Sequence, residues 1–88
     1  MPKFMSTHQL PAGKFTRDQV CQLGQSAQQD AEVKPYRSFL NLSEGKAFCV
    51  IEAGSSDKVA AWFKKVGMPY ESIVQVELEG EGGDVKDV

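Results

Sequence analysis

The side chain best suited to chemistry is that of His8, the only histidine in the chain. A neutral imidazole can ligate a metal, carry a proton or simply hydrogen-bond a nearby carbonyl. His8 falls near the end of a strand-like segment, before a turn, so each of these roles is open. If it faced a side of a sheet without helices, two copies of the chain could bring two imidazoles to one shared cavity. His8 is therefore the candidate metal ligand.

Glu52 and Tyr36 are the candidates for ligand binding. Glu52 places a carboxylate in an otherwise apolar segment, where an unpaired charge would be costly. It could act as a general base, as a metal ligand or as an ion-pair partner of Arg37. Tyr36, like Tyr70, could line a pocket, although aromatic residues in a small domain more often pack.

The two cysteines show no sign of chemistry, and we expect both to pack. Cys49 has apolar neighbours that offer no cation to lower its thiol pKa, and Cys21 lies beside the apolar stripe of a helix. They form neither a disulfide framework nor a metal motif, which suits a reducing cytoplasm. The chain has no serine elbow, phosphate-binding glycine loop or paired metal-ligand motif, so no catalytic residue is predicted.

Composition argues against two classes of partner. Lysine and arginine are spread thinly and the formal net charge is −2, so nucleic acid is not an expected partner. No apolar run approaches the ~18 residues that a membrane span requires, so we expect no membrane association. Met1–Met5 lacks a charged region followed by an apolar core, so no signal peptide is predicted. The 88 residues are enough for one domain with a single thin core.

Four segments have the patterns of strands. Lys46–Ala53 is almost continuously apolar, which predicts a central strand covered on both faces. Lys3–Leu10 predicts a second strand, although its alternation does not show which face is inward. Val33–Leu42 predicts an edge strand, because Pro35 cannot donate to a ladder. Ser72–Glu79 alternates and predicts a strand with one apolar face.

Two segments have the patterns of helices. The first helix begins after Thr16, whose hydroxyl forms a capping box with Gln19 three residues later. The second follows a turn and hydroxyl cap at Gly54–Asp57 and ends before Gly67. Its apolar stripe recurs at helical spacing, at Val59, Trp62, Phe63 and Val66.

The order strand, helix, strand, strand, helix, strand predicts an α+β ferredoxin-like fold, with a four-stranded antiparallel sheet and two helices on one face. In that topology Lys3–Leu10 and Lys46–Ala53 lie in the middle. We expect residues 1–79 to form one domain, and the acidic, glycine-rich residues 80–88 to be a disordered tail. A helix-free sheet face favours a homodimer, because a second subunit can cover it.

Several segments resemble a known family, the domain-of-unknown-function 4242 family of small bacterial proteins, which includes a nickel-binding member. They are Phe4–His8, Leu10–Gly13, Phe48–Ala53, Val66–Pro69 and Ile73–Val76. The resemblance spans about residues 2 to 78 and implies a ferredoxin-like fold, a homodimer and, for some members, a nickel site that uses histidine. By position, His8 would be the ligand. Members that look like metal binders carry further histidines where this chain has Gln9 and Trp62-Phe63, so nickel here would need carboxylates, the terminal amine or a second subunit.

Three functions are therefore open. The leading hypothesis is a cytoplasmic dimeric binding domain that holds a divalent metal such as nickel, or a small ligand, near His8. The alternative is a small cofactor-free enzyme of the oxygenase or isomerase type on a dimeric ferredoxin-like barrel, with His8 as acid and base and Glu52 or a tyrosine assisting. The third is a purely structural or regulatory dimerisation module. A roomy cavity at His8 favours the enzyme, and an open face that packs without a cavity favours the third.

Overall fold

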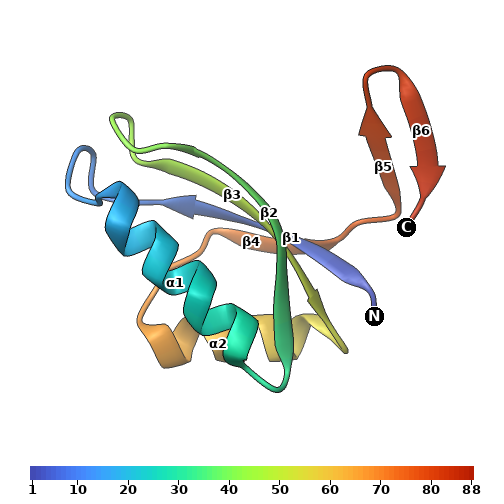
Figure 1. The fold of residues 1–88 in the computed structure, drawn as a ribbon, viewed down its shortest axis with the longest axis horizontal. Coiled ribbons are helices and arrows are strands. Elements are labelled where there is room, and N and C mark those ends of the chain that lie inside the picture. Colours follow the sequence, from blue (N-terminus) through green and yellow to red (C-terminus); the bar gives the residue numbers. More distant parts are fainter.

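A computed structural model describes all 88 residues as a four-stranded sheet, two helices and a C-terminal hairpin (Figure 1). The elements in chain order are β1 (Lys3–Gln9), α1 (Arg17–Gln29), β2 (Val33–Asn41), β3 (Lys46–Ala53), α2 (Ser56–Val66), β4 (Ser72–Gln75), β5 (Leu78–Glu81) and β6 (Asp84–Asp87). β1 to β4 form the main sheet, and β5 and β6 form the hairpin. Neither helix has the length and hydropathy needed to cross a membrane.

The main sheet has the predicted ferredoxin-like arrangement. Its strand order is β2-β3-β1-β4 and all its pairings are antiparallel, so the two predicted central strands do lie in the middle and β2 lies at an edge. Both helices cover the same face of the sheet (Figure 1). The α+β fold predicted from the order of elements is thus confirmed.

Both helices begin at the predicted caps. The N–H of Gln19 donates to the Thr16 hydroxyl at 3.2 Å, and the N–H of Thr16 donates to the Gln19 side chain at 2.9 Å. Ser55 caps α2, and Gly67 ends it with a φ of 72°, a left-handed conformation that glycine adopts at little cost. These helix boundaries were predictable because capping depends on residues only three or four positions apart.

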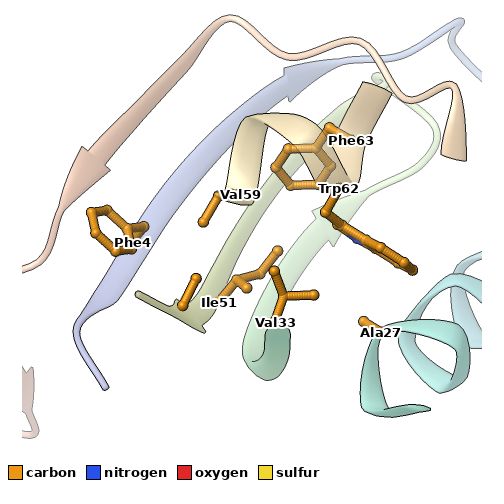
Figure 2. Close-up of a cluster of buried hydrophobic side chains, with 8 residues drawn as sticks. Phe4, Ala27, Val33, Ile51, Val59, Trp62 and Phe63 are labelled. Carbon is orange, nitrogen blue, oxygen red and sulfur yellow. The ribbon is translucent and has the colours of Figure 1, made fainter. Parts of the chain in front are cut away.

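The hydrophobic core lies mainly between the sheet and α2 (Figure 2). Its buried residues are Phe4, Ala27, Val33, Ile51, Ala53, Val59, Trp62 and Phe63. α1 contributes only Ala27. A cavity of about 70 Å³ remains among α1, α2 and the sheet, with a mostly apolar lining.

The central strand β3 differs from its prediction on one point. Ala47, Ile51 and Ala53 are buried against the helices, but Phe48 on the opposite face is 44% exposed. Only one of the two faces is therefore covered within a single chain.

The C-terminal region also differs from its prediction. β4 ends at Gln75 rather than at Glu79, and residues 80–88, for which we expect disorder, belong largely to the β5–β6 hairpin. The turn is formed by Gly82 and Gly83, whose φ values of 60° and 104° are both positive. A two-residue hairpin turn of type I′ needs positive φ at both of its central residues. The disorder prediction used only the acidic, glycine-rich composition of the segment. At this turn the two glycines adopt the positive φ values that allow β5 and β6 to pair.

Candidate functional site

His8 lies on the helix side of the sheet. Along β1 the side chains of Phe4, Ser6 and His8 are buried, while the residues between them are partly exposed on the other face. His8 is only 1% exposed. It is therefore on the opposite side of the sheet from the face on which two copies could form a shared two-imidazole cavity.

Both ring nitrogens of His8 have hydrogen-bond partners. Nδ1 lies 2.7 Å from the Pro69 carbonyl, and because a carbonyl only accepts, Nδ1 carries the proton and donates. Nε2 is then the acceptor for the Ser6 hydroxyl at 2.8 Å. The ring also meets Phe63 edge to face, with ring centroids 4.7 Å apart. Burial lowers the pKa of His8 despite the opposing effects of the Pro69 carbonyl and Glu71, so the ring is neutral near pH 7.

This environment does not fit a nickel ligand within one chain. A metal would need the Nε2 lone pair, which accepts from Ser6, and no group of three histidine, cysteine, aspartate or glutamate side chains is placed to hold an ion. None of the main cavities is lined by His8 either. Through its hydrogen bond to the Pro69 carbonyl, His8 joins β1 to the segment after α2.

Glu52 lies on the helix-free face of β3, half-buried. Its neighbours in register are Lys3 on β1 and Lys34 on β2, but it forms no ion pair with either of them or with Arg37. Its carboxylate is thus separated from His8 by the thickness of the sheet. The structure does not bring these two candidates into one site.

Tyr36 holds the base of the C-terminal hairpin rather than lining a pocket. It occupies an irregularity in β2 between Pro35 and Arg37, and its hydroxyl donates to the Glu79 carboxylate at 2.6 Å. The Lys3 ammonium lies 4.1 Å from the centre of its ring and 3.7 Å from Glu79. The hydrogen bond from Tyr36 lowers the pKa of Glu79 and, in return, raises the pKa of Tyr36. The cluster joins β1, β2 and β5.

The two cysteines differ from each other. Cys49 is on the helix side of β3, where burial raises the pKa of its thiol, in agreement with the predicted packing role. Cys21, also expected to pack, is exposed on α1. Its helix turns only a narrow stripe toward the sheet, and Cys21 falls outside it.

Sequence patterns did not identify the residues of an apolar patch on the helix-free face of the sheet. The patch consists of Met5, Phe39, Phe48, Val50 and Val74. Phe39 pairs with Phe48 across β2 and β3, and Val50, Met5 and Val74 follow one another across β3, β1 and β4. Phe39 is 63% and Val74 51% exposed. The signal for the patch was present in the continuous apolar pattern of β3, which called for cover on both faces.

We expect the free energy of unfolding to fall as the pH drops below about 6.5, because the pKa of His8 is lower in the folded chain than its ordinary value of 6.5. Below about pH 6.5 the imidazole of His8 binds a proton more readily in the unfolded chain than in the folded chain. The stability that is present above pH 6.5 is therefore lost as the pH falls toward the pKa of His8 in the folded chain. Urea unfolding between about pH 7.5 and 5.5 measures this slope.

His8→Asn is the matched variant. It should lower the unfolding free energy by about 1–3 kcal/mol at neutral pH, since one of two buried hydrogen-bond partners is left unpaired. It should also flatten the pH dependence, because no other histidine titrates in this range. An unchanged slope in this variant would contradict the neutral, hydrogen-bonded state of His8.

The fold and surface define a class, small α+β proteins with one sheet face covered by helices and the other left apolar and open. Within that class a family model described as nickel responsive protein SCO4226-like matches residues 4–76. The chain therefore belongs to the SCO4226-like family. The match does not confirm the domain-of-unknown-function name, but it is consistent with the resemblance to a family that includes a nickel-binding member.

A solved structure supports the same assignment. SCO4226 from Streptomyces coelicolor A3(2) is 25% identical to this chain and superposes with a TM-score of 0.75. The match covers 89% of this chain and 99% of that chain. No curated protein matches.

Proposed function

We propose that this protein is a homodimeric binding module whose two copies pair through the helix-free faces of their sheets. The observation that carries the proposal is the apolar patch, in which Phe39, Phe48 and Val74 are each between 44% and 63% exposed. Contiguous apolar surface on a small protein marks an interaction site more often than a free surface. Pairing through this patch would also cover the second face of β3, which is open within one chain.

A second copy is the partner that fits this face best. A two-fold pair places the same patch on both sides of the interface, so apolar side chains meet apolar side chains. The charged residues of the face are of both signs, with Arg37 and Lys46 on the same side as Glu52. A two-fold axis can therefore bring opposite charges together around the patch.

The ligand-binding role of Glu52 and Tyr36 is part of this proposal. Both lie on the helix-free side, and Glu52 is a half-buried carboxylate with no ion pair. A small cationic or hydrogen-bonding ligand held between the paired sheets would contact these groups rather than His8. The enzyme alternative has less support, because the His8 ring has both nitrogens occupied and lines no main cavity.

Sedimentation equilibrium tests the dimer. A single chain has a mass of 9.7 kDa, so the expected mass in solution is about twice that value. A mass of one chain at every concentration up to about 100 μM would contradict the proposal. The free energy of dimerisation would then be less favourable than about −5 to −6 kcal/mol.

The family description makes nickel the first metal to test, and we expect His8 not to be its ligand. Titration calorimetry with nickel should give the same affinity, or the same absence of heat, for the unchanged protein and for His8→Asn, because Nε2 is already an acceptor for Ser6. A second variant, Glu52→Gln, tests whether nickel binds between the two copies. Nickel binding that is lost only in His8→Asn would restore His8 as the ligand.

A further inference from the structure

We propose that the hairpin arm, residues 77–88, of each copy lies on the helix-free face of the other copy. The inference rests on the proposed dimer and adds to it the element that completes the interface. The family match ends at residue 76, so the arm lies outside the residues that the family model matches.

The arm stands away from the rest of the chain. Figure 1 shows β5 and β6 projecting from the sheet on the side opposite the helices. At its base the arm is joined to the rest of the chain through Glu79. The Glu79 carboxylate accepts a hydrogen bond from the Tyr36 hydroxyl at 2.6 Å and lies 3.7 Å from the Lys3 ammonium. A lone two-stranded hairpin is marginally stable in water. The arm therefore needs a surface that one chain does not provide.

The arm has one face suited to an apolar surface. The register pairs Leu78 with Asp87 and Gly80 with Val85, so Leu78, Val85 and the carboxylate of Asp87 project from the same face of the hairpin. Leu78 and Val85 are 57% and 64% exposed. Glu79 is on the other face, where it binds Tyr36 and Lys3. Leu78 and Val85 are thus left free for contact with a partner.

Charge also favours the second copy as that partner. The arm carries five carboxylates against the single Lys86, a net charge of −4. Because the whole chain is at −2, the remaining residues carry a net +2. On the helix-free face the apolar patch has Arg37 and Lys46 beside it. An acidic arm with two apolar side chains complements the edge of the paired patch, where these basic residues lie.

The arm can enlarge the interface between paired sheets. A stable interface buries about 800 Å² of accessible surface on each partner. The projecting arm is the element of this chain that can extend the contact beyond the face of the sheet (Figure 1).

The test uses the full chain with both apolar arm residues replaced, Leu78→Ser with Val85→Ser. The dimer dissociation constant, measured by sedimentation, should rise at least tenfold. Neither residue belongs to the hydrophobic core, so the near-ultraviolet circular dichroism of Trp62 should be unchanged. A second full-length variant, Glu81→Lys with Asp84→Lys, should weaken the dimer and remove most of its dependence on salt.

The outcomes separate the two proposals. A dimer whose dissociation constant is unchanged in both variants would overturn the arm contact and leave the paired sheets standing. A monomeric unchanged protein would overturn the dimer, and the arm contact with it. Weakening by both variants, with salt dependence lost only in the second, supports the arm on its partner.

Discussion

Phe48→Asp is expected to convert the dimer into a monomer without unfolding the chain. Phe48 belongs to the apolar patch and is paired with Phe39 on β2 and Thr7 on β1. In a paired interface the new carboxylate would be buried against apolar side chains, and in a two-fold dimer this occurs twice. The dissociation constant should rise at least a hundredfold. The single chain tolerates the change because the side chain is already 44% exposed.

Tyr70→Asp is the matched control. Tyr70 is also aromatic and 43% exposed, but it lies in the segment after α2 and contacts Phe63 on the helix side. The Tyr70→Asp variant should remain dimeric in sedimentation experiments. Equal weakening by both variants would show that added charge alone, rather than the patch, controls association.

Phe63→Ala should cause the largest loss of stability among single substitutions, about 3–5 kcal/mol, the cost of removing a buried phenylalanine and leaving a cavity. Phe63 is 3% exposed and belongs to the core on α2. It also contacts His8 edge to face and lies 5.8 Å from Tyr70, centroid to centroid. Urea unfolding at one fixed protein concentration measures the loss, since the stability of a dimer depends on concentration.

Phe63→Leu separates the aromatic contact from the volume. It keeps most of the apolar bulk and should cost about 1–2 kcal/mol, chiefly the edge-to-face contact with His8 and imperfect packing. A loss below about 1 kcal/mol for Phe63→Ala would contradict the placement of this ring at the centre of the core.

The predictions that succeeded depended on short-range patterns. Neighbouring residues were enough to predict three features. These are the cap at Thr16, the end of α2 at Gly67 and the strand Lys46–Ala53. Backbone hydrogen bonding and capping act over three or four residues, so such features survive without knowledge of the rest of the chain.

The C-terminal arm shows where composition misleads. The same glycines that predict disorder adopt positive φ at the two centres of a hairpin turn, Gly82 and Gly83. Composition reports an average over a segment, whereas a turn depends on which glycine stands at which position.

By itself the sequence determined the two helices and the four strands of the main sheet, their order, and so the ferredoxin-like topology. Tertiary structure decided which face of β1 is inward, because both of its faces mix polar and apolar residues. The hydrogen-bond partners of His8 are Ser6, two residues before it, and the carbonyl of Pro69, 61 residues away, and its ring packs edge to face against Phe63. Long-range contacts of this kind have no local signal, and here they make the one histidine part of the core and leave the opposite face open.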